Sequence, residues 1–304
     1  MSAEAWNLLA HGHLCWQLAS CGVDALVLKG PSLTSWLYAP GERIPSSDVD
    51  VLVGPSHARA ATRCAQDLGY AEYYAGLAGT EVPGYACSLR LARPGEGDTF
   101  LDLHTAYPGI GIAPESSFQR LWSTREEGAI AGVPVWFPSK PARALIVALH
   151  VARDPGPEKS HEDLRRAWQA LGPTGRQQLA ELAHTLDAAP ALRAGLEAEP
   201  SLGRSAVAEL GLSHVAVPPE WALLSGAASG TTMHLFEVSR RPWRQRPRAL
   251  AQWAFPSPAL MRLRDPRATG GRVPLARAYA ERIWVGTKAL PGAWRRLRDL
   301  PPDR

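Results

Sequence analysis

Three aspartates in the first third of the chain stand beside the apolar runs of expected strands, where carboxylates are unusual. Asp48 and Asp50 alternate with valine in RIPSSDVDVLVG, and Asp102 alternates with leucine in TFLDLHT. Because side chains along a strand alternate between its two faces, the acids of each run point away from the apolar residues. An unpaired carboxylate is costly to bury, so acids at such positions are usually paired, hydrogen-bonded or bound to metal.

If the two strands are neighbours in one sheet, Asp48, Asp50 and Asp102 converge. Three clustered carboxylates repel one another unless cations lie between them, and oxygen-only ligand sets favour Mg²⁺ or Mn²⁺. Two such metals can hold the attacking and leaving oxygens of a phosphoryl or nucleotidyl transfer. His104 shares the face of Asp102, which fits either a neighbour of the site or a hydrogen-bonded structural histidine.

A phosphate-binding turn is the other part that this chemistry needs. Gly30 lies at an expected strand-to-helix junction in ALVLKGPSLTSWLY, where a glycine lets the backbone approach a phosphate and the helix offers free N–H groups. Lys29, Ser32, Arg43 and Ser47 could add charge or hydrogen bonds. Lys29 fits a solvated strand end equally well, and Arg43 could instead brace the aspartates through a salt bridge.

The segments LVLKGPSLTSWLY, RIPSSDVDVLV and FLDLH together resemble the nucleotidyltransferase superfamily that includes DNA polymerase β, and most closely its uncharacterised branch. By this resemblance Asp48 and Asp50 would bind both metals, while Asp102 would complete the second metal site and help to activate the acceptor hydroxyl. Gly30 and Ser32 would hold the triphosphate.

One residue departs from the pattern of that superfamily. Many members have Gly-Gly or Gly-Ser at the turn, whereas Pro31 follows the glycine here and removes one N–H donor.

The resemblance implies a metal-dependent, ATP-binding transferase. It would move a nucleoside monophosphate from a nucleoside triphosphate, with ATP as the expected nucleotide, to an acceptor hydroxyl or phosphate and release pyrophosphate. The acceptor could be a small molecule, a peptide or an RNA. The alternative is a non-catalytic scaffold of the same fold that binds nucleotide, RNA or a protein partner. A third reading, a toxin-like modifier of RNA or protein, rests on the arginine-rich end alone.

The expected fold is α+β, with a nucleotidyltransferase-type mixed sheet flanked by helices and then a mostly helical region. We place the domains at residues 1–138 and 139–304, because the pattern becomes almost wholly helical at residue 139. The second domain ends in a basic segment rich in arginine and tryptophan.

Composition suits a globular protein, with 304 residues, 45% of them apolar, and a formal net charge of +4. No apolar run approaches the length of a membrane span, and the first residues lack the basic start and cleavage site of a signal peptide. The four cysteines, Cys15, Cys21, Cys64 and Cys87, are scattered. They predict isolated, buried thiols in the reducing cytoplasm.

Three further patterns favour structural roles. His150 lies among apolar residues of an expected helix, as a hydrogen-bonded core histidine would. Asp163 and Arg166 are one helical turn apart, which is typical of an exposed ion pair, although the resemblance also suggests that Asp163 contacts nucleotide or acceptor. Four tryptophans lie among the arginines of the last third of the chain: Trp243, Trp253, Trp284 and Trp294. We expect them to be core residues, with the arginines between them exposed.

Overall fold

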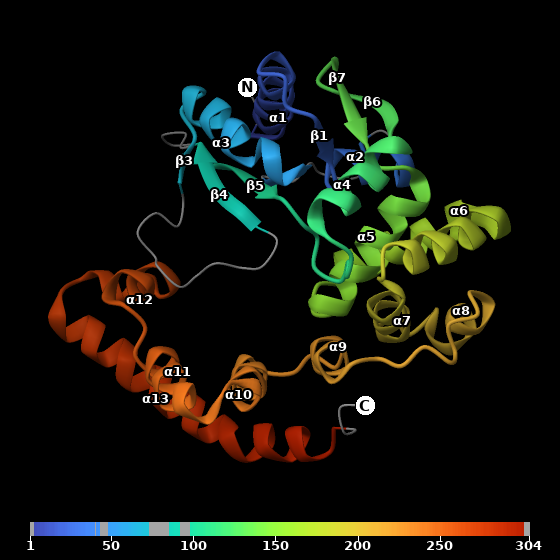
Figure 1. Ribbon diagram of the computed structural model, residues 1–304. Coiled ribbons are helices and arrows are strands. Elements are labelled where there is room, and N and C mark those ends of the chain that lie inside the picture. Colours follow the sequence, from blue (N-terminus) through green and yellow to red (C-terminus); the bar gives the residue numbers. More distant parts are fainter. Residues whose placement is uncertain (1–2, 40, 43–47, 73–84, 92–97, 301–304) are drawn as a thin grey trace. The chain divides into compact units, whose positions relative to one another are not determined.

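A mixed β-sheet organises the first part of the molecule (Figure 1). The computed structural model describes residues 3–39, 41–42, 48–72, 85–91 and 98–300. In these residues seven strands pair in the order β3-β4-β5-β2-β1-β7-β6. Their bounds are β1 Ala25–Val27, β2 Asp48–Val53, β3 Ala71–Glu72, β4 Tyr85–Leu91, β5 Thr99–His104, β6 Glu126–Ile130 and β7 Val133–Phe137.

Two pairs of strands are parallel, β2 with β5 and β1 with β7, and the other neighbours are antiparallel. The predicted hairpin of residues 84–104 is confirmed by the antiparallel pairing of β4 with β5. The parallel pairing of β2 with β5 aligns the two aspartate-bearing runs side by side.

The apolar face of the sheet explains why the acids point the other way. Val49 and Val51 of β2 and Leu101 and Leu103 of β5 are fully buried in one cluster with residues of α1 (Ala3–Ser20) and α3 (Ala58–Asp67). Since strand residues alternate between faces, the aspartates between these positions are directed to the opposite side of the sheet.

The described part of the first compact unit, which contains residues 1–75 and 81–216, has six more α-helices. They are α2 Pro31–Leu37, α4 Pro114–Ser123, α5 Lys140–Arg153, α6 Glu158–Thr185 and α7 Ala189–Ala198, and the short α8 Gly203–Glu209 follows. Helices α5, α6 and α7 pack on one another, and α6 also contacts α2. The predicted α+β class is confirmed. The helices after residue 139, up to residue 216, therefore belong to the same compact unit as the sheet.

The second unit contains residues 217–304 and is helical in its described part. Its helices are α9 Pro219–Ser225, α10 Gly230–Arg240, α11 Arg246–Ala254, α12 Pro258–Arg264 and the long α13 Arg272–Arg298. Within this unit α13 packs on α10, α11 and α12. Among the described residues, no helix has the length and apolar character to cross a membrane.

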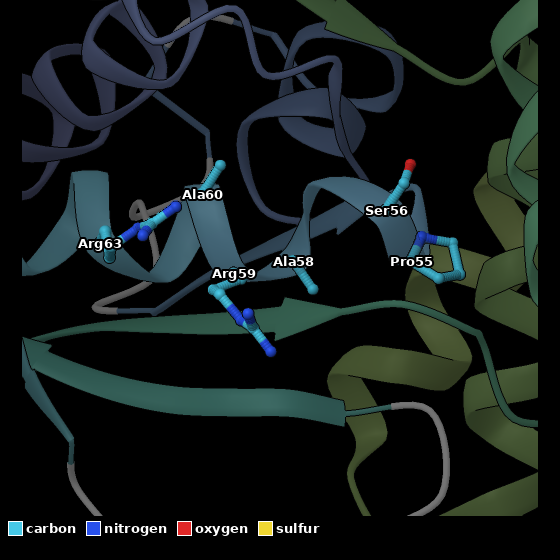
Figure 2. A pocket seen from close by; sticks show the side chains of 6 residues that line it. All are labelled: Pro55, Ser56, Ala58, Arg59, Ala60 and Arg63. Atoms are coloured by element: carbon cyan, nitrogen blue, oxygen red, sulfur yellow. The ribbon is translucent and has the colours of Figure 1, made fainter.

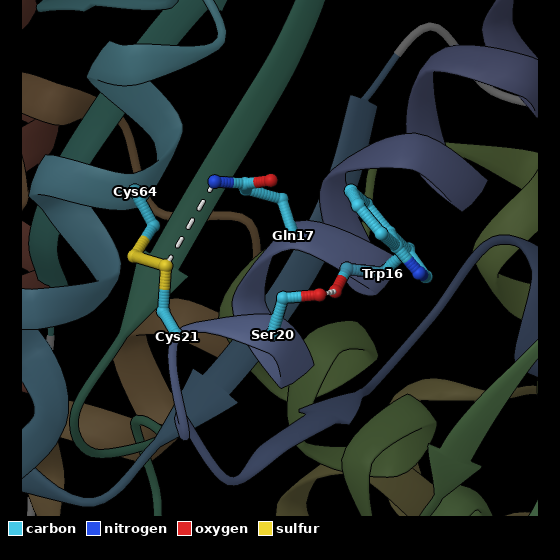
Figure 3. Close-up of a disulfide and its surroundings, with 5 residues drawn as sticks. All are labelled: Trp16, Gln17, Ser20, Cys21 and Cys64. Atoms are coloured by element: carbon cyan, nitrogen blue, oxygen red, sulfur yellow. Dashed lines mark hydrogen bonds between the residues drawn. A yellow bond between two sulfur atoms is a disulfide. The ribbon is translucent and has the colours of Figure 1, made fainter.

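The expectation of isolated thiols is wrong for two cysteines. Cys21, after the end of α1, and Cys64 of α3 form a disulfide with a Cα–Cα distance of 6.8 Å (Figure 3). The two helices pack side by side on the sheet, which brings together cysteines that are 43 residues apart. Cys15 is a free, buried thiol, as expected, and burial raises its pKa to about 12. Cys87 lies in β4, and its side chain is outside the described part.

Candidate active site

The three predicted aspartates lie on two adjacent strands in compatible register. Asp50 of β2 is the Cα partner of Asp102 of β5, and Asp48 is the partner of Phe100. In parallel strands, paired residues direct their side chains to the same face, and residues two apart on one strand share that face. The register therefore puts all three carboxylates on the sheet face opposite the valine–leucine core.

Asp50 is the most enclosed of the three acids, at 5% exposure, whereas Asp48 and Asp102 are half-buried. Its Oδ1 atom lies 3.2 Å from Lys29 Nζ and 3.0 Å from His104 Nε2. Burial alone would raise the pKa of Asp50, but the hydrogen bond from His104 and the charge of Lys29 hold the pKa well below its usual range. The carboxylate is thus ionised at neutral pH.

Lys29, a predicted site residue, forms an ion pair with Asp50. It follows β1, which pairs with β2, and the Leu28 amide donates to the Asp50 carbonyl at 2.9 Å. Burial lowers the pKa of Lys29, but the neighbouring Tyr107 and Asp50 raise it above the usual range. Lys29 is therefore a cation held against the central acid, rather than a solvated strand end.

The Gly30 turn runs beside the start of β2. Gly30 has φ +62°, a left-handed conformation that favours glycine, and a Cβ built on it would lie 3.8 Å from the Asp48 carbonyl oxygen. Its own carbonyl accepts from the amides of Leu33 and Thr34, at 3.1 and 2.9 Å, which starts α2. The turn and the acid strand are thus in close proximity.

Ser32 is fully buried, and its hydroxyl donates to the Leu28 carbonyl at 2.9 Å. Its own carbonyl accepts from Arg143 Nη1 at 2.9 Å, and Arg143 also pairs with Glu126. Ser32 therefore connects the turn to Leu28, just after β1, and to α5, and its hydroxyl is directed inward. The other two predicted phosphate contacts, Arg43 and Ser47, lie outside the described residues.

His150 and Arg153 of α5 were not assigned to the site from the sequence, but both interact electrostatically with the site residues. His150, at the end of α5, has its pKa lowered to about 3, first by burial and then by Lys29 and Arg153, while Asp50 and Asp48 oppose the shift. His150 Nδ1 also lies 3.3 Å from Arg153 Nη2. His150 is therefore a neutral imidazole at neutral pH. The only sequence signal was the polar pair His150 and Arg153 closing an apolar helix.

Asp163 is buried, so the expectation that it is an exposed residue is wrong, and both Asp163 and Arg166 contact other partners. Asp163 is 5% exposed and accepts from the Tyr38 hydroxyl at 2.5 Å. Arg166 instead pairs with Glu42 and Glu162, both at 2.6 Å, and its guanidinium lies 4.3 Å from the centre of the Tyr38 ring. These contacts join the end of α2, which starts at the Gly30 turn, to α6.

A separate pocket of about 480 Å³ lies over the short helix η1 (Pro55–His57) and α3 (Figure 2). Its lining residues are Pro55, Ser56, Ala58, Arg59, Ala60 and Arg63. Helix α3 packs on the valine–leucine face of the sheet, so this pocket belongs to the side opposite the acids. It contains none of the predicted site residues.

The sequence of this chain also matches a known protein family. Residues 7–199 match the family described as uncharacterised nucleotidyltransferase, and the chain belongs to this family. No protein with a curated description matches the sequence.

The chain is also similar to solved structures at low sequence identity. The solution structure of the antibiotic-resistance factor ANT(2'')-Ia is 17% identical, with a TM-score of 0.39, and the match covers 60% of this chain and 97% of that one. The crystal structure of ANT(2'')-Ia in complex with adenylyl-2''-tobramycin has the same identity and coverage, with a TM-score of 0.42. An antigenic nucleotidyltransferase-like protein from Paracoccidioides brasiliensis is 16% identical, with a TM-score of 0.37, over 62% of this chain and 92% of that one.

Proposed function

We propose that this chain is a metal-dependent nucleotidyltransferase that moves a nucleoside monophosphate from a nucleoside triphosphate to an acceptor hydroxyl or phosphate. The observation that carries the proposal is the register of Asp50 opposite Asp102, with Asp48 two residues away on the same face. Family membership supports the same reaction class.

The donor set suits Mg²⁺ or Mn²⁺ in chemical type, because carboxylate oxygens are the ligands that these ions prefer. Asp48, Asp50 and Asp102 would hold the metal, which supplies charge to the triphosphate and lowers the barrier to displacement at phosphorus. Within the described part of the chain, no three acidic, histidine or cysteine side chains are gathered as a metal site. Oδ1 of Asp50 contacts Lys29 and His104 instead.

The side chains have definable tasks in the transfer. Lys29, beside Gly30, would offer its ammonium group to the phosphates of the nucleotide, and the open Gly30 turn would admit them. As the acceptor oxygen bonds to the α-phosphorus, the bond to pyrophosphate breaks. Asp102 would accept the proton that the acceptor hydroxyl loses. His104 and Tyr107 would hold the Lys29–Asp50 pair away from bulk water.

A variant series tests the assignment of the acids. Pyrophosphate release from each nucleoside triphosphate should require Mg²⁺ or Mn²⁺ and should be lost in Asp48→Ala, Asp50→Asn and Asp102→Asn. Asp67→Asn is the matched control, because Asp67 is an exposed carboxylate at the end of α3 on the other side of the sheet. Release that continues undiminished in the three site variants would refute the proposal.

The second candidate is a non-catalytic scaffold that binds nucleotide, and one observation favours it. The central carboxylate already has two cationic or hydrogen-bonding partners, Lys29 and His104, so the structure satisfies Asp50 by its own side chains. Calorimetric titration with Mg²⁺ and each nucleoside triphosphate, followed by measurement of pyrophosphate, separates the two functions. Binding without any release would identify the scaffold.

A further inference from the structure

The long helix α13 exposes a stripe of large apolar side chains. Trp284 is 61% exposed, Trp294 70% and Ile283 40%. The expectation that the late tryptophans are core residues is wrong for these two and for Trp243, which is 71% exposed. At 3.6 residues per turn, Ile283, Leu290 and Trp294 lie in one row of the helix surface, and Trp284 and Val273 lie in a second row about a quarter turn away.

The side of α13 that adjoins Ile283 and Leu290 already packs on its own unit. The buried residues Ala278, Gly286 and Ala293 face the rest of the unit, and they lie roughly opposite Trp284 and Val273 on the helix surface. Gly286 lies so close to Trp253 that an added Cβ would approach the ring to 3.0 Å. The apolar stripe is therefore a second surface of α13, in addition to the one that its fold requires.

Basic side chains border the stripe and give the whole unit a strong positive charge. Arg277, Lys288 and Arg295 recur at intervals of 11 and 7 residues, so they form a row beside Trp284, and the Lys288 ammonium lies 4.5 Å from the centre of the Trp284 ring. Residues 217–304 contain 16 lysines and arginines against 6 acidic residues, whereas residues 1–216 contain 17 against 23.

We propose that the exposed side of α13 docks on an anionic phospholipid surface and lies in the plane of that surface. Interfacial helices combine a Trp- and Leu-containing apolar face with flanking Lys and Arg, and anionic headgroups complement the charge of this unit. Single-stranded nucleic acid would use flat rings for stacking, but it offers no apolar phase to Val273, Ile283 and Leu290. The aliphatic side chains therefore favour lipid over nucleic acid.

Vesicle co-sedimentation of the full chain tests this surface. Wild-type protein should bind vesicles of phosphatidylcholine mixed with phosphatidylserine far better than vesicles of phosphatidylcholine alone, and added salt should weaken the binding. The double variants Trp284→Ala/Trp294→Ala and Lys288→Glu/Arg295→Glu should each reduce binding about tenfold or more. Trp16→Ala is the control, because Trp16 is 53% exposed on α1 of the acidic unit and should leave binding unchanged.

Circular dichroism of each variant establishes that the helices are retained. Equal binding to neutral and anionic vesicles, absence of binding, or wild-type binding by both double variants would overturn the proposal. A parallel titration with single-stranded RNA tests whether the same surface binds nucleic acid instead of lipid. If RNA is bound through the same four residues and vesicles are not, the surface is a nucleic-acid site and the lipid proposal is wrong.

Discussion

Lys29 Nζ lies 3.2 Å from Oδ1 of Asp50, the residue that faces Asp102 across strands β2 and β5. His104 Nε2 approaches the same oxygen to 3.0 Å. The central acid of the predicted trio is thus held as a carboxylate by Lys29, two residues after β1, and by His104 of β5. Any ligand or metal that engages Asp50 must do so beside, or in exchange with, these partners.

Removing the lysine tests this relationship. Lys29→Met should lower the free energy of unfolding by about 1–3 kcal/mol, because a buried carboxylate loses a charged partner while His104 still donates to it. Urea unfolding of this variant measures the effect, and Lys140→Met, at an exposed lysine, is the control. A Lys29 variant as stable as the control would show that the contact with Asp50 is energetically unimportant.

His150 should contribute to the acid sensitivity of the fold. Its pKa is about 3 in the native state and about 6.5 in an unfolded chain, so the unfolded state alone binds a proton between these values. Its contribution to stability is complete above about pH 6.5 and is lost as the pH falls toward 3. His150→Gln should therefore flatten the dependence of the free energy of unfolding on pH in this window.

The control for that series is His184→Gln, because His184 is exposed near the end of α6. If His150→Gln keeps the same acid dependence as this control, the burial of a neutral imidazole beside Lys29 is not supported.

Tyr38 and Asp163 should be energetically coupled. The hydroxyl-to-carboxylate hydrogen bond of 2.5 Å joins α2 to α6, and hydrogen bonds to charged groups are worth about 1.5–3 kcal/mol. A double-mutant cycle of Tyr38→Phe and Asp163→Asn, followed by urea unfolding, should give a coupling energy of this size. Strict additivity of the two single effects would contradict the contact.

The disulfide between Cys21 and Cys64 predicts a redox-dependent stability. Reduction, or the variant Cys21→Ser/Cys64→Ser, should lower the free energy of unfolding by about 2–4 kcal/mol, since the unfolded chain gains freedom. Thiol labelling of the native protein should leave both cysteines unmodified until a reductant is added. Rapid labelling of both without reductant would show that the bond does not form.

Local patterns were sufficient to predict the acid-bearing strands. Asp48 and Asp50 alternate with valines, and Asp102 alternates with leucines, so each acid must lie on the face opposite the apolar residues. The pairing of β2 with β5 is then sufficient to bring the three acids together. The glycine at position 30 was likewise predictable, because a strand running into a helix here requires positive φ.

Contacts between distant segments were not predictable in the same way. Tyr38 and Asp163 are separated by 125 residues, and nothing in either segment specifies the other. The charged surroundings of His150 depend on how α5 packs in the unit, which periodicity does not determine. The Cys21–Cys64 bond depends in the same way on the packing of α1 against α3. The exposure of Trp284 and Trp294 could not be predicted from composition, because a tryptophan among arginines can lie in a core or on a surface equally well.

The most direct test of the central claim is the transfer of label from an α-phosphate-labelled nucleoside triphosphate in a total cell extract. With wild-type protein and Mg²⁺ or Mn²⁺, label should enter a discrete acceptor, whether RNA, protein or small molecule, and a chelator should prevent this. Asp50→Asn should transfer none, while Asp67→Asn should match the wild type. Label transfer by the Asp50 variant at the wild-type level, or none by the wild type with any nucleotide, would contradict the assignment of catalysis to these acids.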